Sequence, residues 1–338
     1  MENSVDTVNR KSSAGPRLVA VFVTVLLGIA ASPLRASPAC GSTVTGHVVF
    51  DSDVNCVNSN GLTVGADGTT IDLAGFMLTC TAAAGYFGSC QGQGDVGIDT
   101  NGFSDILIKG PGTIDGFAVG VHVNAGADVN VRELTVTGPA SPGAGSNSRP
   151  EATGIEVEGT ICPTPAVTII NVHGNDVSNH REGIELVNAH CVNVGHNHAH
   201  DNNSDPTECH GVLAVDSGDN NFNNNLIDRN GENLGIDGGL TFKGASSANN
   251  TVTNNDVSNN CGDGISVRFG GNNNQVVNNE ARNNSTSTLG TQCFGPPPPG
   301  VFFDLAARSA GAGNMWNKNN KCNTQSAGIP PGVCNPGE

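Results

Sequence analysis

The chain is poor in aromatic residues: 1 Trp, 1 Tyr and 12 Phe stand among 338 residues, against 46 Gly. Such a composition offers too few bulky side chains for a core of packed helices, and small residues and turns dominate instead. Sugar-binding grooves often use exposed aromatic rings as apolar platforms with a polar handle. The scarcity of these rings therefore argues against a helical fold and against a tight binder of neutral glycans.

Positive charge is also scarce, with 15 Lys and Arg against 31 Asp and Glu. Residues 1–36 hold 4 of the basic and 2 of the acidic side chains, so 15 − 4 = 11 basic and 31 − 2 = 29 acidic residues follow, a formal charge of −18. This balance excludes nucleic acid as an expected partner. An acidic polysaccharide would be repelled as well unless a local cationic strip or a bridging divalent cation receives it.

No apolar run reaches the roughly 18 residues that a membrane-spanning helix needs. The 14-residue run LVAVFVTVLLGIAA (18–31) follows Arg10, Lys11 and Arg17, and small residues come after it. This order predicts a secretory signal peptide over residues 1–36, with a retained membrane anchor as the alternative. We expect the mature chain to be secreted or periplasmic, to have no membrane span and to be a monomer.

The sequence does contain a repeat. At intervals of 23 to 36 residues, Gly is followed by three residues of which the first and third are apolar. A constant strand signature with a variable period indicates a solenoid whose loops differ in length from coil to coil. The motif begins at Gly61, Gly97, Gly120, Gly154, Gly183, Gly211, Gly239, Gly264 and Gly300.

Asparagine recurs three residues after a second apolar position in each repeat, ending at Asn319. A second series consists of Asn202, Asn230, Asn260 and Asn284. Asn tolerates the left-handed conformation that a tight corner requires, and its amide can hydrogen-bond to the same residue one coil away. We therefore predict asparagine ladders at the corners of stacked coils.

The segments CGSTVTGHVVFDSDVNCVNSNGLTVGADGTTIDLAGFML (40–78) and NMWNKNNKC (314–322) resemble the first coil and the closing segment of the right-handed parallel β-helix superfamily, the pectate-lyase-like fold. The resemblance covers residues 37–338. It implies an all-β, single-stranded right-handed parallel β-helix of about nine coils, with caps at 37–60 and 314–338. Because this superfamily includes lyases, epimerases, hydrolases and non-catalytic surface proteins, the resemblance is specific for fold only.

The 11 cysteines favour disulfides in an exported chain, since no pair of Cys-x-x-Cys units is present. Pairs close in sequence, or brought together by stacked coils, are expected to bond, although other connectivities stay compatible. This pairing leaves Cys209 outside any disulfide. The expected pairs are Cys40 with Cys56, Cys80 with Cys90, Cys162 with Cys191, Cys261 with Cys293, and Cys322 with Cys334.

Alternate side chains leave the core of a strand, so two outward columns follow from the repeat. One column places Lys243 next to Arg268, and such like charges one coil apart would be relieved by a bound carboxylate. Lyases and epimerases of uronate polymers abstract a proton beside a carboxylate, so they need neutralising charge and a base. Lys243 and Arg268 are candidates for both roles.

Further outward positions complete the expected groove. Glu158, Asp216 and Asp304 are predicted to line it or to hold Ca²⁺, the expected cofactor. Phe302 is the clearest outward aromatic and joins the substrate-binding candidates. The competing interpretation is an ordinary solvated face on which the cations point to acidic neighbours.

Histidines cluster in the sequence, since seven of nine fall between residues 173 and 210. His198 and His200 are expected on one outward strand face about 7 Å apart, with Asp176 one coil before and Asp228 one coil after. These four residues are candidate ligands for Zn²⁺ or Cu²⁺, and either His could instead act as a general base. Accidental clustering in a polar region is the alternative.

Two functions follow from these observations. The first is a lyase or C5-epimerase acting on an acidic polysaccharide, favoured by Lys243, Arg268 and the superfamily. The second is a non-catalytic cell-surface or periplasmic β-helix that binds or spaces other molecules and carries a metal at the histidine cluster. The acidic composition and the scarcity of aromatic residues favour this second function.

Overall fold

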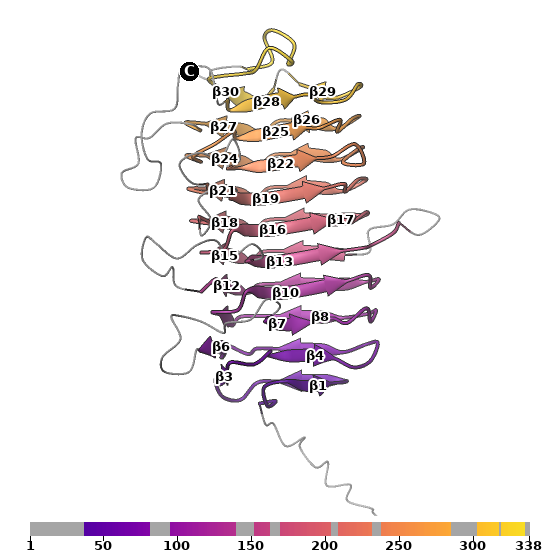
Figure 1. Ribbon diagram of the computed structural model, residues 1–338, viewed down its shortest axis with the longest axis vertical. Helices are drawn as coiled ribbons and strands as arrows, with labels where there is room; N and C mark the ends of the chain where they lie inside the picture. Colours follow the sequence, from indigo (N-terminus) through magenta and orange to yellow (C-terminus); the bar gives the residue numbers. More distant parts are fainter. Residues whose placement is uncertain are drawn as a thin grey trace, which may run out of the picture. The chain divides into compact units, whose positions relative to one another are not determined.

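A computed structural model describes residues 37–81, 95–139, 152–162, 170–203, 209–231, 238–284, 303–317 and 319–334. The predicted signal peptide, residues 1–36, lies outside the described residues. Strands β1 to β30 pair in parallel into three ten-stranded sheets, and successive strands of the chain enter successive sheets. This topology is a parallel β-helix of ten coils, which Figure 1 shows as stacked strands coloured in chain order.

Each sheet takes one strand from every coil. The first, sheet A, contains β1 (Ser42–Val44), β4 (Leu62–Val64), β7 (Val96–Asp99), β10 (Val119–Asn124), β13 (Thr153–Glu158), β16 (Glu182–Val187), β19 (His210–Val215), β22 (Leu240–Lys243), β25 (Ile265–Arg268) and β28 (Leu305–Arg308). Sheet B contains β2 (His47–Val49), β5 (Thr70–Asp72), β8 (Leu107–Lys109), β11 (Val129–Arg132), β14 (Ile170–His173), β17 (Val192–Gly195), β20 (Asn221–Asn223), β23 (Thr251–Thr253), β26 (Gln275–Val277) and β29 (Met315–Trp316). Sheet C contains β3 (Val54–Val57), β6 (Met77–Thr81), β9 (Thr113–Asp115), β12 (Thr135–Thr137), β15 (Asp176–Ser178), β18 (His198–His200), β21 (Leu226–Asp228), β24 (Asp256–Ser258), β27 (Glu280–Arg282) and β30 (Lys321–Cys322).

The count of ten coils exceeds the expected nine because residues 42–57, expected to form a cap, contain β1, β2 and β3. In the last coil the sheet A strand is Leu305–Arg308, and Leu305 pairs with Ile265. The strand predicted to begin at Gly300 is therefore displaced by several residues. This shift matters for function, since it moves Asp304 from the outward column to the position that Gly occupies in the other repeats.

The core is built from small β-branched and aliphatic side chains stacked in register. One inward column runs along sheet A, and each member is at most 1 % exposed. Because parallel strands lie roughly 4.8 Å apart, side chains of equal size contact the same position one coil away. The members of this column are Ile98, Val121, Ile155, Ile184, Val212, Leu240, Ile265 and Leu305.

Pairs of consecutive asparagines form the corners, and the two residues of a pair have different structural roles. In the pair Asn254–Asn255 the first has φ of 57° and is exposed, whereas the second is 1 % exposed. The Asn255 side-chain amide donates to Asn279 Oδ1 at 3.0 Å and to the Phe222 carbonyl at 3.0 Å. We expected a single asparagine to adopt the left-handed conformation and to form the ladder. In the structure Asn254 adopts the left-handed conformation and Asn255 forms the ladder.

Three buried corner ladders are present in the described residues. The first runs Asn175, Asn197, Asn225, Asn255, Asn279 and Asn320, so the predicted final member, Asn319, is wrong by one residue. The second runs Asn202, Asn230, Asn260 and Asn284 as predicted, and ends on Asp304. The third, which the sequence interpretation missed, runs Asn220, Asn250, Asn274 and Asn314.

Disulfides brace the coils as predicted. The pairs Cys40–Cys56, Cys162–Cys191 and Cys322–Cys334 are bonded, with Cα–Cα distances of 5.5, 5.3 and 4.8 Å. Cys80 and Cys261 are also disulfide-bonded, and their predicted partners, Cys90 and Cys293, lie outside the described residues. Cys209 is a buried thiol. Disulfides of this density are consistent with an oxidising location outside the cytoplasm.

Across the part of the chain that the structure describes, no helix has the length and apolar character needed to cross a membrane.

Candidate functional site

Strands β7, β10, β13 and β16, in the middle of sheet A, line a pocket of about 410 Å³. Strands β10, β13 and β16 place His122, Glu156 and Glu185 side by side in one outward column, because their backbones pair in register. Glu158 stands two residues after Glu156 on the same face, and Arg181 borders the pocket. Four titratable groups and a guanidinium therefore converge on one cavity.

Glu185 is an unusually weak acid for a carboxyl group. Its partial burial raises its pKa to about 7, and the negative charges of Glu182 and Glu156 act in the same direction. Thr153 Oγ1 donates a hydrogen bond to Glu185 Oε2 at 3.1 Å. A carboxyl with this pKa takes up and releases protons near neutral pH, as general acid–base catalysis requires.

His122 lies between carboxylates. Its Nδ1 is 3.5 Å from Asp99 Oδ1, and its Nε2 is 3.5 Å from Glu158 Oε2. The contact with Asp99 is the largest cause that raises the pKa of His122 above its ordinary value, and it outweighs partial burial. Of the ligand-type atoms in this pocket, those of His122, Glu156 and Glu158 lie within 4.8 Å of one another.

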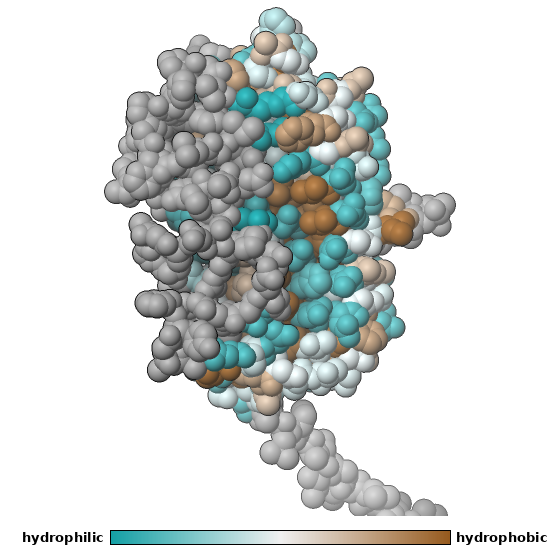
Figure 2. All heavy atoms as spheres, viewed as in Figure 1, coloured by the Kyte–Doolittle hydropathy of each residue, from teal (hydrophilic) through white to brown (hydrophobic). Residues whose placement is uncertain are grey.

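The face of sheet A changes character along the coils. In the outer column that contains Glu158, the members that follow it are Val187, Val215 and Lys243. Figure 2 shows the same change, from hydrophilic side chains to a hydrophobic patch and back to hydrophilic ones. An acidic pocket and a cationic stack thus flank an apolar strip on one face.

The cationic stack consists of Lys243, Arg268 and Arg308 in register. The expectation that Arg268 faces solvent is wrong, since its side chain is 2 % exposed. Asp263, fully buried, contacts Arg268 at 3.1 Å and accepts from Arg308 Nη2 at 2.8 Å. The carboxylate that relieves the repulsion therefore comes from the chain itself. Lys243 keeps its expected outward place and is partly exposed.

Two other groove candidates take different places from those expected. Asp304 is 1 % exposed, and its carboxylate accepts from Asn284 and from the backbone of Asn323, so it terminates a ladder instead of facing solvent. Asp216 follows β19 in the turn, where it accepts from the Ser246 backbone at 3.3 Å, and Val215 occupies the column. Phe302 lies outside the described residues.

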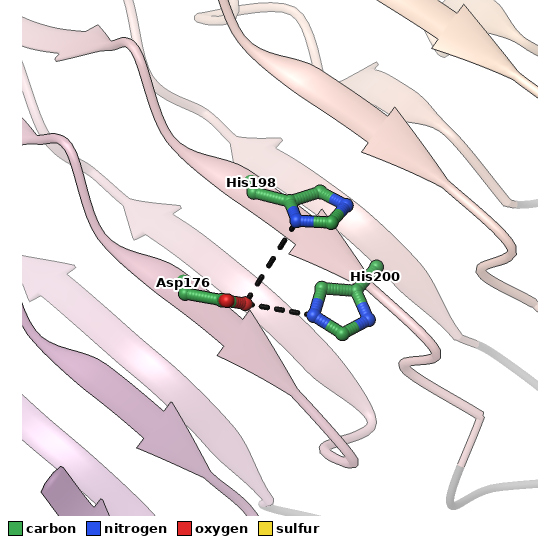
Figure 3. Close-up of side chains that lie close together, drawn as sticks. All are labelled: Asp176, His198 and His200. Atoms are coloured by element: carbon green, nitrogen blue, oxygen red, sulfur yellow. Dashed lines mark hydrogen bonds and ion pairs between the residues drawn. The ribbon is translucent and has the colours of Figure 1, made fainter.

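The histidine cluster lies on the outer face of sheet C, where β15, β18 and β21 are neighbours. His200 Nε2 is 2.7 Å and His198 Nδ1 is 3.9 Å from the same atom, Asp176 Oδ1. The rings stack with centroids 4.1 Å apart, closer than the expected 7 Å. Figure 3 shows both rings directing a nitrogen toward Asp176.

Asp228 lies behind this group instead of facing it. Its Oδ1 is 2.9 Å from His198 Nε2, the nitrogen that points away from Asp176. The corresponding nitrogen of His200, Nδ1, is 2.6 Å from Asp201 Oδ2. Partial burial acts to raise the pKa of Asp201, but hydrogen bonds from Arg229 and His200 outweigh it and lower the pKa. The structure thus brings three of the four predicted ligands together.

The sequence interpretation missed Glu185, Asp201 and Arg229 as site residues. The signal for Glu185 was present, since it occupies the same motif position as His122 and Glu156 in the preceding repeats. Asp201 and Arg229 follow their strands and belong to no outward column, so only the folded geometry identifies them.

Comparison with known proteins fits the coiled strands just described. The sequence profile of the right handed beta helix region matches residues 89–281, more than half of the chain. The chain belongs to this family. A comparison with curated proteins finds no match.

Three solved structures are similar to this chain. The periplasmic alginate epimerase AlgG is 15% identical with a TM-score of 0.50, over 81% of this chain and 66% of that chain. The Dettilon tailspike protein (gp208) is 14% identical with a TM-score of 0.49, over 84% and 60%. Pectate lyase Pel9A is 11% identical with a TM-score of 0.30, over 88% and 71%.

At 15% identity the likeness to the AlgG structure shows the fold alone. The chain also spans less than two thirds of the length of the tailspike and the AlgG structure, at 60% and 66%.

Proposed function

We propose that this β-helix is a polysaccharide-active enzyme, a lyase or C5-epimerase, that acts on a uronate polymer at the sheet A pocket. The observation that carries the proposal is the carboxyl group of Glu185. Its pKa is about 7, and it lies in a cavity beside His122 and Glu156. A proton beside a carboxylate is abstracted most efficiently by a base whose pKa lies near the working pH. Glu185 is that base.

The reaction begins when Glu185 takes the proton from C5 of a uronate residue. In a lyase the electron pair left on C5 forms a double bond to C4, and the C4 oxygen leaves with a proton. In an epimerase C5 receives a proton on its opposite face. His122, whose pKa is raised, is placed to donate a proton.

The carboxylate of the substrate needs positive charge, because the pocket itself is acidic. Glu156 and Glu158 present carboxylate oxygens, the ligand type that Ca²⁺ takes, so this part of the pocket fits the ion, although an imidazole is not a usual Ca²⁺ ligand. Ca²⁺ would supply positive charge beside the substrate carboxylate. Lys243, further along the same face, would bind the carboxylate of another sugar unit.

The test uses the chain from residue 37 onward with alginate, polygalacturonate and sulfated uronans in deuterated buffer, with and without Ca²⁺. New ultraviolet absorbance reports β-elimination, and deuterium at C5 without absorbance reports epimerisation. The variant Glu185→Gln should lose at least about 100-fold in kcat. Glu133→Gln, an exposed carboxyl outside the pocket, is the matched control.

No absorbance change and no deuterium uptake on any polymer would overturn the proposal. That result would favour the non-catalytic alternative, which the acidic composition supports. Full activity of Glu185→Gln would place the chemistry elsewhere on the β-helix.

A further inference from the structure

The second cluster of ligand-type side chains, on sheet C, has its own geometry and does not depend on the proposed enzyme activity. Asp176 stands on β15, and His198 and His200 stand on β18, with both side chains of β18 on one face because they are two residues apart. In this trio, one nitrogen of each ring and one carboxylate oxygen lie within 4.8 Å of one another.

The spacing of these three atoms fits a small divalent transition metal. Zinc binds His nitrogen at about 2.0–2.1 Å and carboxylate oxygen at about 2.0–2.2 Å, so tetrahedral ligand atoms lie about 3.3 Å apart. The distances from Asp176 Oδ1 are 2.7 Å to His200 Nε2 and 3.9 Å to His198 Nδ1, on either side of that value. Small side-chain rotations would equalise them.

In both rings the nitrogen that points away from Asp176 contacts a carboxylate. His198 Nε2 lies 2.9 Å from Asp228, and His200 Nδ1 lies 2.6 Å from Asp201. A carboxylate has no proton to offer, so in neutral rings that donate to Asp228 and Asp201 the nitrogens that face Asp176 carry lone pairs, as a metal ligand requires. Metal-binding histidines are oriented in this way by hydrogen bonds to their second nitrogen.

Arg229 fixes the two supporting carboxylates in place. Its Nη2 is 3.1 Å from Asp201 Oδ2 and its Nη1 contacts Asp228 Oδ2. Nη2 also lies 3.3 Å from His200 Nδ1, a longer contact than that of Asp201 with the same nitrogen. One guanidinium therefore connects the supports of both histidines.

The charge of the cluster matches a divalent cation. Asp176, Asp201 and Asp228 contribute three negative charges and Arg229 one positive charge, which sum to −3 + 1 = −2. The 2.7 Å contact of His200 Nε2 with Asp176 Oδ1 also needs a proton or a metal cation between the two atoms, because a ring nitrogen without its proton and a carboxylate oxygen both present lone pairs. A metal ion at this point satisfies both requirements.

We propose that Asp176, His198 and His200 form a binding site for a first-row divalent transition metal, with Zn²⁺ as the representative ion. Asp201, Asp228 and Arg229 are positioning residues. Three protein ligands leave one position of a tetrahedral ion for water or a ligand molecule, the pattern of an open metal site. The mixed nitrogen and oxygen donors disfavour Ca²⁺ here, which takes oxygen ligands.

The test measures Zn²⁺ bound to the untagged chain from residue 37 onward, by titration calorimetry and by metal analysis after dialysis. We expect one Zn²⁺ per chain, lost in the double variant His198→Ala/His200→Ala and not replaced by excess Ca²⁺. The matched control is His173→Ala/His196→Ala: His173 ends β14 and His196 follows β17 one coil later, and their ring centroids are 4.8 Å apart. Circular dichroism confirms that each variant folds.

Three results would overturn the proposal: no Zn²⁺ bound at micromolar concentration, binding that survives in His198→Ala/His200→Ala, or binding lost in the control pair. Loss of Zn²⁺ in His122→Ala alone would place the metal in the sheet A pocket instead. Because the readout is bound metal and not turnover, its failure is separate from failure of the lyase or epimerase test.

Discussion

His200 makes a diagonal contact with Asp176 on the neighbouring strand β15. The Nε2 to Oδ1 distance is 2.7 Å, although the backbone of His200 pairs with Ser178. His198 makes the reverse diagonal, to Asp228, whose backbone pairs with His200. Diagonal neighbours on adjacent strands lie within reach of long side chains. The crossed contacts bring the two rings into a stack and direct one nitrogen of each toward the same carboxylate.

Arg229→Gln should weaken Zn²⁺ binding by about 10- to 100-fold without abolishing it, because the supports of both histidines lose their common partner. Titration calorimetry measures the affinity. Arg132→Gln, which removes an exposed arginine paired with Glu133 on the outside of sheet B, is the control and should leave the affinity unchanged. Equal affinities for Arg229→Gln and the unaltered chain would remove Arg229 from the positioning role.

Glu185 predicts a dependence of stability on pH. Its pKa is raised in the folded state, from 4.5 to about 7, so folding favours the protonated form. The associated stability is fully present below about pH 4.5 and is lost as pH rises to about 7, by about 3 kcal/mol for this shift. Denaturant unfolding of the unaltered chain and of Glu185→Gln across this window measures the effect.

The fall between these pH values should be absent from Glu185→Gln and retained in Glu133→Gln, whose carboxyl is exposed. A parallel fall in Glu185→Gln would assign the pH dependence to another group.

Asn255→Ala should lower the free energy of unfolding by about 1–3 kcal/mol, since it leaves buried partners of the ladder without their hydrogen bonds. The exposed neighbour supplies the control: Asn254→Gly should change stability little, because φ of 57° suits glycine. Urea denaturation compares the two. A larger loss for Asn254→Gly than for Asn255→Ala would contradict the division of labour within the pair.

Asp263→Asn should destabilise the protein by about 3–5 kcal/mol, because it leaves the buried guanidinium of Arg268 without its carboxylate. Adding Arg268→Met should recover part of the loss by removing the buried charge. Asp256→Asn, at an exposed position of β24, is the control. Thermal unfolding measures the stability of each variant. If the double variant is as unstable as Asp263→Asn alone, Asp263 acts chiefly through other partners such as the Phe303 backbone.

The repeat alone was sufficient to predict the stacked coils, the strand register of most coils and most of the ladder residues, but not which column positions stay exposed in the later coils. Gly, alternating apolar residues and paired asparagines are local signals that recur in every repeat, so an error in one coil is corrected by its neighbours. The last sheet A strand was misplaced where the repeat weakens, since no Gly precedes Leu305. Asp304 consequently entered the outward column in the prediction and stands in a ladder in the structure.

The sequence by itself determined which residues stack, because a parallel solenoid converts equal positions in successive repeats into spatial neighbours. On that basis it grouped Asp176 with His198 and His200, and Lys243 with Arg268. Only the tertiary structure decided what each group does. Burial and a neighbouring carboxylate turned Arg268 into an internal ion pair with Asp263, and burial gave Glu185 its pKa near 7. Diagonal contacts separated Asp228 from the three converging ligands, since side-chain direction and desolvation depend on the packed surroundings and are not encoded in spacing along the chain.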